Sequence, residues 1–174
     1  MREAEDLLFE ISRTLARTGR TLAKLRDMLA PWFPVSPETG QALEDTTLIA
    51  THALLKRFEQ HVDAVRAMAR TIIRLQGEQD RYRTVRQAFD RLASLGLVDD
   101  VGRLMELVDL RDRTAHAYAL QSERQARILN AVFDAVPELM TLAARLGRFA
   151  RETRLLPEER DAVLEELEAL ARSA

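Results

Sequence analysis

AEDLLFEISRTLARTGRTLAKLRDML, residues 4–29, is the stretch that decides the fold. Apolar or neutral residues recur in it at spacings that alternate between four and three, namely Ala4, Leu8, Ile11, Leu15, Thr18, Leu22, Leu25 and Leu29. Because residues three and four apart share one face of an α-helix, this spacing predicts a long helix with a single buried stripe. The helix is expected to end at Pro31.

The rest of the chain repeats this helical pattern. A second long helix is predicted from about Glu44 to Gly77, a third from an N-cap at Asp80 to Gly96, and a fourth after Asp99 or Asp100. A fifth begins near residue 122, and a short sixth follows LLPEER, residues 155–160. No strand pattern occurs. We predict an all-α, up-and-down helical bundle of four to five core helices plus a short C-terminal helix. Residues 1–150 would form the bundle, and residues 151–174 would form a C-terminal helical tail.

Length and composition limit the class of protein. The chain has 174 residues, of which 47% are hydrophobic and 5% aromatic, which favours one helical domain with one core. It contains no cysteine, which excludes a disulfide framework, a thiolate nucleophile and a thiolate metal site. No uncharged run approaches the ~18–20 residues of a membrane span, and the first ten residues are acidic where a secretory signal would be basic. We expect a cytoplasmic protein with no membrane partner.

Charge is unevenly distributed along the chain. The formal net charge is −2, which does not by itself indicate a nucleic-acid-binding protein. Residues 66–86 are nevertheless rich in arginine, and Arg66, Arg70 and Arg74 recur at helical spacing. They predict either a basic groove for phosphates or a solvated face that pairs with neighbouring acids.

Polar residues interrupt the fourth helix in VDLRDRTAHAYAL, residues 108–120. Arg111 follows Leu104 by seven positions and Val108 by three, which places it on the apolar stripe. A buried guanidinium without a partner would cost several kcal/mol, so Arg111 needs an anion, a carboxylate or a water-filled cleft. The alternative to a functional site is a structural salt bridge to another helix, or exposure where the bundle ends.

His116 lies five residues after Arg111, about 140° away on a continuous helix. The two side chains could share a site if the helix loosens near Ala115, or if a symmetric dimer brings two copies together. Asp112 precedes His116 by four residues and could orient its imidazole. His52 and His61 face opposite sides of their helix, so no metal site is predicted.

RDRTAHAY, residues 111–118, matches the pattern Arg-x4-His-x-Tyr. This pattern resembles the motif of the HEPN superfamily, in particular the HepT-like toxins that are paired with minimal nucleotidyltransferase antitoxins. The preceding residues 82–110 are similar in layout to the HepT helix, glycine turn and acidic cap before the motif helix. The resemblance extends from about Leu22 to Phe149. The chain departs from the family pattern at residues 113–115, where Arg113, Thr114 and Ala115 stand in place of an apolar run.

The resemblance implies a function and a set of site residues. Arg111 and His116 would be the nuclease pair, with Asp112 as the polar residue that supports them, and RNA would be cleaved without a metal or cofactor. Tyr118 would be the hydroxyl that a cognate minimal nucleotidyltransferase antitoxin modifies with AMP. From the residues themselves we expect a homodimer whose interface includes the fourth helix, because Arg111 lies on an apolar face that is too wide for one bundle to cover. Two alternatives stay open: a catalytically inert helical subunit that binds a nucleotidyltransferase or its substrate, and a plain helical scaffold.

Overall fold

The computed structural model describes residues 2–114 and 123–173. In this part of the chain seven α-helices are found and no strand. They are α1 (Arg2–Leu29), α2 (Pro37–Gln41), α3 (Asp45–Leu75), α4 (Val85–Ser94), α5 (Val101–Thr114), α6 (Glu123–Glu152) and α7 (Asp161–Ser173). Two short 3-10 turns are also present. Ala30–Trp32 follows α1, and Glu158–Arg160 precedes α7.

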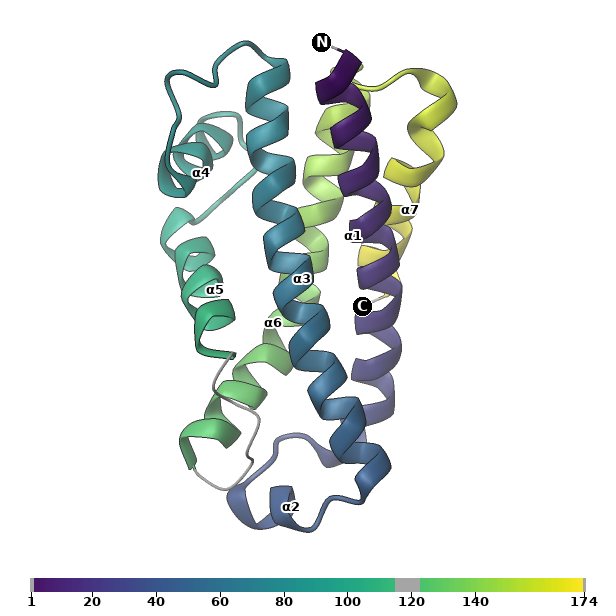
Figure 1. Cartoon of the computed structure of the whole chain (residues 1–174), viewed down its shortest axis with the longest axis vertical. Coiled ribbons are helices and arrows are strands. Elements are labelled where there is room, and N and C mark those ends of the chain that lie inside the picture. Colours follow the sequence, from purple (N-terminus) through teal and green to yellow (C-terminus); the bar gives the residue numbers. More distant parts are fainter. Residues whose placement is uncertain (1, 115–122, 174) are drawn as a thin grey trace.

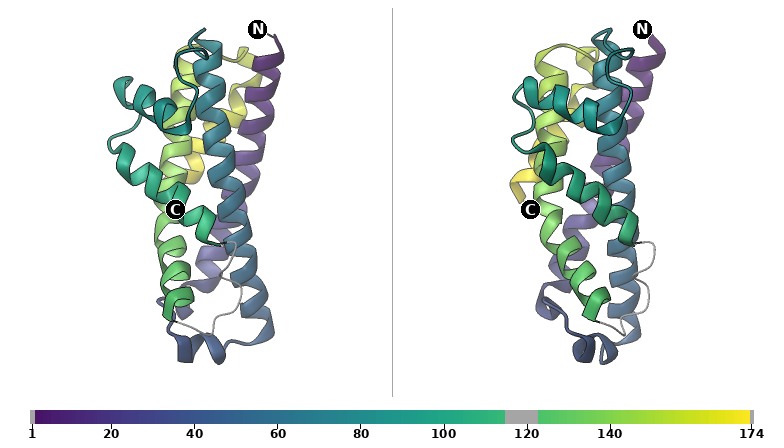
Figure 2. Two further views of the ribbon diagram at one scale, coloured as in Figure 1. Left: turned by 60° about the vertical axis from the view of Figure 1, so that its left-hand side comes forward. Right: turned by 90° about the vertical axis from the view of Figure 1, so that its left-hand side faces the viewer.

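Three long helices form the body of the bundle (Figure 1). α1 runs in one direction, and α3 and α6 run in the other. α5 packs against α3 and α6 on one side, and α7 packs against α1 and α6 on the other (Figure 2). The predicted all-α, up-and-down bundle is therefore confirmed. Among the described helices, none is long and apolar enough to cross a membrane.

The apolar stripe of α1 lies in the core as its spacing predicts. All eight of its predicted positions, from Ala4 to Leu29, are buried. The stripe faces the apolar faces of α3 and α6, so that Leu15, Phe58 and Leu139 belong to one continuous core. Burial of these side chains is the main favourable contribution to the stability of such a bundle.

The C-terminal residues contribute to the same core. Leu164 and Leu167 of α7 are buried in it. Gly147 lets α6 approach closely, because a Cβ atom there would lie 3.2 Å from Leu167 Cδ1 and 3.5 Å from the Leu164 carbonyl oxygen. Residues 161–173 thus pack as a helix of the bundle.

The start of α4 differs from the prediction. The sequence predicts Asp80 as its N-cap. Instead, Thr84 accepts a hydrogen bond from the Gln87 backbone N–H, and the Gln87 side chain accepts one from the Thr84 N–H. This reciprocal capping box satisfies two backbone donors at once, which a single aspartate cap does not. Gly96 adopts a left-handed φ of 72° after α4, as predicted.

Candidate functional site

The structure places two of the four predicted site residues. Arg111 and Asp112 lie in the last turn of α5, which ends at Thr114. His116 and Tyr118 lie outside the described residues. The candidate site is therefore described through Arg111, Asp112 and the residues that they contact.

Arg111 forms a salt bridge to another helix. One guanidinium nitrogen donates to Asp63 Oδ2 of α3 at 2.7 Å, and the other donates to Asp112 Oδ1 at 3.2 Å. The hydrogen bond to Asp63 is the main cause that raises the pKa of Arg111 above its ordinary value, so the guanidinium is charged at every physiological pH. Arg111 Nε is buried and has no acceptor among the described residues. The interhelical salt bridge foreseen as the structural alternative is thus present.

Asp112 takes part in this pairing. It was predicted to orient His116, and in the structure its carboxylate accepts from Arg111 while most of its side chain is exposed. The contact is between adjacent residues on the surface, where ion pairs contribute little to stability. Its predicted role toward the imidazole stays a prediction.

A second polar contact lies one turn away from Asp63. Thr114 is fully buried, and its hydroxyl lies 2.7 Å from Glu59 Oε1 and 2.6 Å from the Arg111 carbonyl oxygen. Glu59 Oε2 accepts from Lys56 Nζ at 3.0 Å. Glu59 and Asp63 are four residues apart on α3, so they point to the same side of that helix. Both therefore contact the last turn of α5 from α3.

Neither Glu59 nor Asp63 was predicted as a site residue. Their spacing of four along the second helix was the available signal, since it places two carboxylates on one face. The sequence does not say which helix that face meets. Thr114, noted only as a departure from an apolar run, is the residue that meets Glu59.

The arginine stripe of α3 begins beside this contact. Arg66 donates to Asp63 Oδ1 at 3.3 Å, Arg70 reaches the Arg83 carbonyl oxygen at 3.5 Å, and Arg74 reaches Glu3 at 3.5 Å. Arg66 and Arg70, but not Arg74, line an open hollow between α1 and α3 together with Leu7, Ile11, Asp63, Ala67 and Thr71. Part of the stripe thus pairs with acids, and part of it lines a hollow. A groove for phosphates stays a prediction.

The apolar face of α5 is covered within one chain. Leu104, Leu107, Val108 and Leu110 are buried against the rest of the bundle. The exposed large apolar residues of the described chain lie elsewhere: Leu7, Met28, Trp32 and Ile49. The expectation that this face is too wide for one bundle was wrong, and it was the reason for predicting a dimer through this helix. The oligomeric state stays a prediction.

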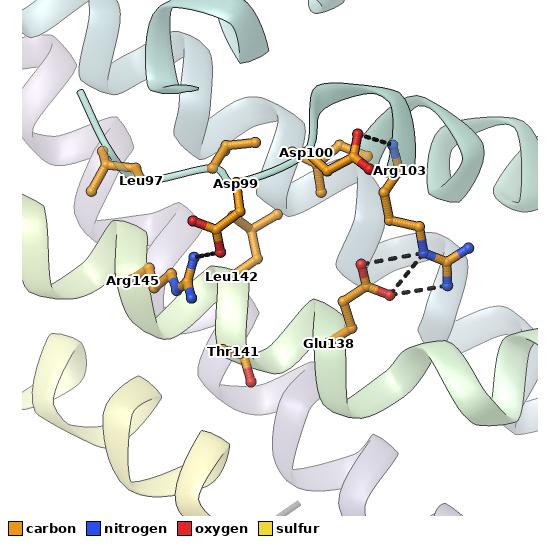
Figure 3. A pocket seen from close by; sticks show the side chains of 10 residues that line it. Leu97, Asp99, Asp100, Arg103, Glu138, Thr141, Leu142 and Arg145 are labelled. Atoms are coloured by element: carbon orange, nitrogen blue, oxygen red, sulfur yellow. Dashed lines mark hydrogen bonds and ion pairs between the residues drawn. The ribbon is translucent and has the colours of Figure 1, made fainter. Parts of the chain in front are cut away.

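A hollow of about 220 Å³ lies between the N-terminal end of α5 and α6 (Figure 3). Its arginines already have partners, because Arg103 pairs with Glu138 at 3.0 Å and Arg145 pairs with Asp99 at 2.5 Å. No motif residue lines it. It is therefore separate from the candidate site at the other end of α5.

The described residues offer no cluster of histidines and carboxylates that would hold a metal ion. His61 is buried between helices, with its Nδ1 2.7 Å from the Thr18 hydroxyl oxygen. Burial lowers the pKa of His61 to about 4, so its imidazole is neutral at pH 7. The other ring nitrogen, Nε2, is buried and has no hydrogen-bond partner among the described residues.

No family model, curated protein or solved structure matches this chain. The resemblance to the HepT-like proteins therefore depends on residues 82–118 and the helix order alone.

Proposed function

We propose that this chain is a HEPN-type toxin, a metal-independent ribonuclease that acts in the cytoplasm and is neutralised by a partner nucleotidyltransferase. The observation that carries the proposal is the position of Arg111. It is a charged, partly exposed guanidinium in the last turn of α5, three residues before the described part of α5 ends and five before His116. Arg66 and Arg70 lie beside it on α3.

The chemistry assigns separate tasks to the two motif residues. His116 would act as the general base that takes the proton from the 2′-hydroxyl as its oxygen attacks the adjacent phosphorus, or as the general acid that protonates the 5′-oxygen as the P–O5′ bond breaks. Arg111 would stabilise the negative charge that develops on the phosphate. A guanidinium suits this task because it is charged at all working pH values and offers several donors in one plane. Two chains in a homodimer would bring two such sets around one cleft.

Neutralisation would act at Tyr118. An AMP group on its hydroxyl adds a phosphodiester charge and a bulky base two residues from His116. The added phosphate would pair with Arg111 and occupy the place where RNA must bind. No refolding of the bundle is needed for this inhibition.

A second candidate is a catalytically inert subunit that binds the nucleotidyltransferase or presents a nucleotide to it. The pairing of Arg111 with Asp63 and Asp112 favours this alternative. Two carboxylates next to Arg111 reduce the positive potential available to a phosphate. The two candidates differ in whether the purified protein cleaves RNA.

The first experiment measures cleavage of single-stranded RNA in EDTA by the wild type, Arg111→Ala and His116→Ala. We expect cleavage by the wild type and its loss in both variants, with unchanged far-UV circular dichroism. Arg148→Ala is the matched control, because Arg148 also forms an interhelical ion pair, with Glu168, on the opposite side of the bundle. If the wild type leaves RNA intact, the inert-subunit candidate replaces the nuclease.

The second experiment tests the modification. The protein is incubated with the cognate nucleotidyltransferase, ATP and magnesium, and its mass is measured. We expect a gain of one or more AMP units that Tyr118→Phe abolishes. The chain has one other tyrosine, so Tyr82→Phe is the control and should keep the gain. Modification at any other residue contradicts the proposed role of Tyr118.

A further inference from the structure

Asp63 is the carboxylate that joins the motif arginine to the arginine stripe of α3. Its Oδ2 accepts from Arg111 at 2.7 Å, and its Oδ1 accepts from Arg66 at 3.3 Å. One carboxylate thus bridges two guanidinium groups that come from different helices. Without Asp63, α3 and α5 would present two adjacent positive charges at the end of the motif helix.

The bridge is open to solvent. The exposed fractions of the side chains are 44% for Asp63, 32% for Arg111 and 31% for Arg66. Ion pairs at such positions contribute about 0–1 kcal/mol, because water and salt compete for both partners. An anion that binds two arginines at once can therefore compete with the carboxylate.

A phosphodiester has the chemistry to do so. Its two non-bridging oxygens carry one negative charge between them, as the two oxygens of Asp63 do. Each oxygen can accept a charge-assisted hydrogen bond from a separate guanidinium. A phosphodiester therefore brings the same single negative charge as the carboxylate whose place it takes.

The surroundings of Asp63 leave room for a chain of phosphates. It lines two neighbouring hollows along α1 and α3, which share Ile11 as well. Arg70 lines the first hollow and Arg17 the second, on either side of Asp63. Small side chains, Ala64 and Ala67, form part of the lining and do not fill the groove. Arg17, Arg66 and Arg70 thus line the two hollows, together with the carboxylates of Glu10 and Asp63. Three cations along one groove match a run of phosphates better than a single small anion.

We propose that Asp63 occupies the position of an RNA phosphate between Arg111 and Arg66, and that RNA displaces it when it binds. This inference rests on the proposed function and adds a residue that sets RNA affinity. Asp63 acts as a built-in competitor that occupies both arginines until a polyanion binds. Removal of this competitor strengthens RNA binding. If Asp63 only positioned Arg111 for RNA, its removal would weaken RNA binding.

The test uses a 2′-O-methyl RNA oligonucleotide, which lacks the 2′-hydroxyl and is not cleaved. Its affinity is measured by fluorescence anisotropy for the full-length wild type, Asp63→Asn and Asp109→Asn. Asp109 is the matched control, because it is an exposed aspartate of α5 with no ion pair to any described residue, and its replacement changes the net charge equally. We expect Asp63→Asn to bind about tenfold more tightly than the wild type, since about one strong charge-assisted contact is gained. Asp109→Asn should bind within about twofold of the wild type, because exposed charges are screened.

The dependence on salt and on Arg111 sharpens the test. Each further phosphate that the protein neutralises steepens the slope of log K against log salt by about 0.7 for a single strand. We expect a steeper slope in Asp63→Asn and no change in Asp109→Asn. In the Arg111→Ala background, Asp63→Asn should lose most of its tenfold gain. If Asp63→Asn gains the same RNA affinity with Arg111 present and with Arg111→Ala, the proposal that RNA displaces Asp63 from Arg111 is wrong.

The outcomes separate this inference from the proposed function. If the wild type cleaves unmodified RNA, but Asp63→Asn binds the oligonucleotide no more tightly than Asp109→Asn, the inference is wrong and the nuclease stands. If Asp63→Asn binds more tightly and the wild type does not cleave, Asp63 is the competitor in an RNA-binding protein that is not a nuclease. If no variant binds or cleaves RNA while circular dichroism shows folded protein, both proposals fail.

Discussion

α5 and α7 flank the same three-helix body, yet they are attached to it in different ways (Figure 2). α7 inserts Leu164 and Leu167 into the core, and arginines of α1 and α6 surround this apolar contact with ion pairs to its glutamates. α5 also buries an apolar face, but its last turn meets α3 through polar groups, Arg111 with Asp63 and Thr114 with Glu59.

The two kinds of contact differ in how precisely they fix the position of a helix. An apolar contact stabilises the fold in proportion to the area it removes from water and tolerates small shifts. A buried hydroxyl and carboxylate have to meet within hydrogen-bond distance, because leaving either without a partner costs about 1–3 kcal/mol. The polar contacts of α5 therefore fix the position of the turn from which residues 115–122 continue. α7 provides stability on the far side of the bundle.

α3 serves both sides. His61 contacts α1 through Thr18, and its Cε1 lies 3.6 Å from where a Cβ atom on Gly19 would be. Glu59 and Asp63 contact α5. These three polar residues of α3 thus belong to two separate contacts. His61 belongs to one in the core, and Glu59 and Asp63 belong to one at the candidate site.

The largest expected effect is on the α7 side. Leu164→Ala should lower the free energy of unfolding by about 3 kcal/mol, because it leaves a cavity in a fully buried position. Urea denaturation measures this change. Leu7→Ala is the control and should change stability by less than about 0.5 kcal/mol, since Leu7 is 45% exposed. RNA binding by folded Leu164→Ala should equal that of the wild type. A parallel loss of binding would show that the two sides are coupled.

The next effect concerns His61 and pH. Its folded pKa of about 4 lies below the ordinary value of about 6.5, so the unfolded chain binds a proton that the folded chain excludes. The contribution of His61 to stability is therefore complete above pH 6.5 and is lost as pH falls toward 4. Between pH 7.5 and pH 5 the loss should be about 2 kcal/mol.

Denaturation at the two pH values tests this expectation in His61→Gln, which should lose most of that difference. His52→Gln, on the same helix, keeps the buried imidazole in place and should retain it. An unchanged pH dependence in His61→Gln would contradict the assignment.

Thr114→Val should have a smaller effect. The variant keeps the shape of the side chain and removes the hydroxyl that Glu59 accepts from, so it should destabilise the protein by about 1–2 kcal/mol. Thr114→Ser keeps the hydroxyl and should restore most of this loss. If the valine and serine variants are equally stable, the buried polar contact does not hold the end of α5.

The smallest effect is expected for the Arg111–Asp63 pair. A double-mutant cycle with Arg111→Ala and Asp63→Ala should give a coupling of less than about 1 kcal/mol in unfolding free energy, because both side chains are partly exposed. A small coupling in stability together with a large one in RNA binding would separate the functional contact from the structural ones. A coupling of several kcal/mol would instead make the pair a structural element.

The sequence by itself determined the long helices and the buried stripe, because both depend on spacing along the chain. The alternation from Ala4 to Leu29 fixes one face of α1, and Gly96 marks the end of α4 since only a residue that tolerates a left-handed φ suits that position. The sequence also singled out Arg111 as a charged group at an apolar position. Several side chains before α4 can accept hydrogen bonds from its first backbone N–H groups, and the sequence did not show which one does. The cap is Thr84 and not Asp80.

Only the tertiary structure decided which side chains meet. Asp63 and Arg111 are 48 residues apart, and Glu59 and Thr114 are 55 apart, so no periodicity relates them. Periodicity gives the angle of a side chain around its own helix, but the partner depends on which helices are neighbours and on how far each is shifted along its axis. The same reason explains why the sequence indicates only a tail at residues 151–174, since Leu164 and Leu167 of this segment pack against α1 and α6 and belong to the common core.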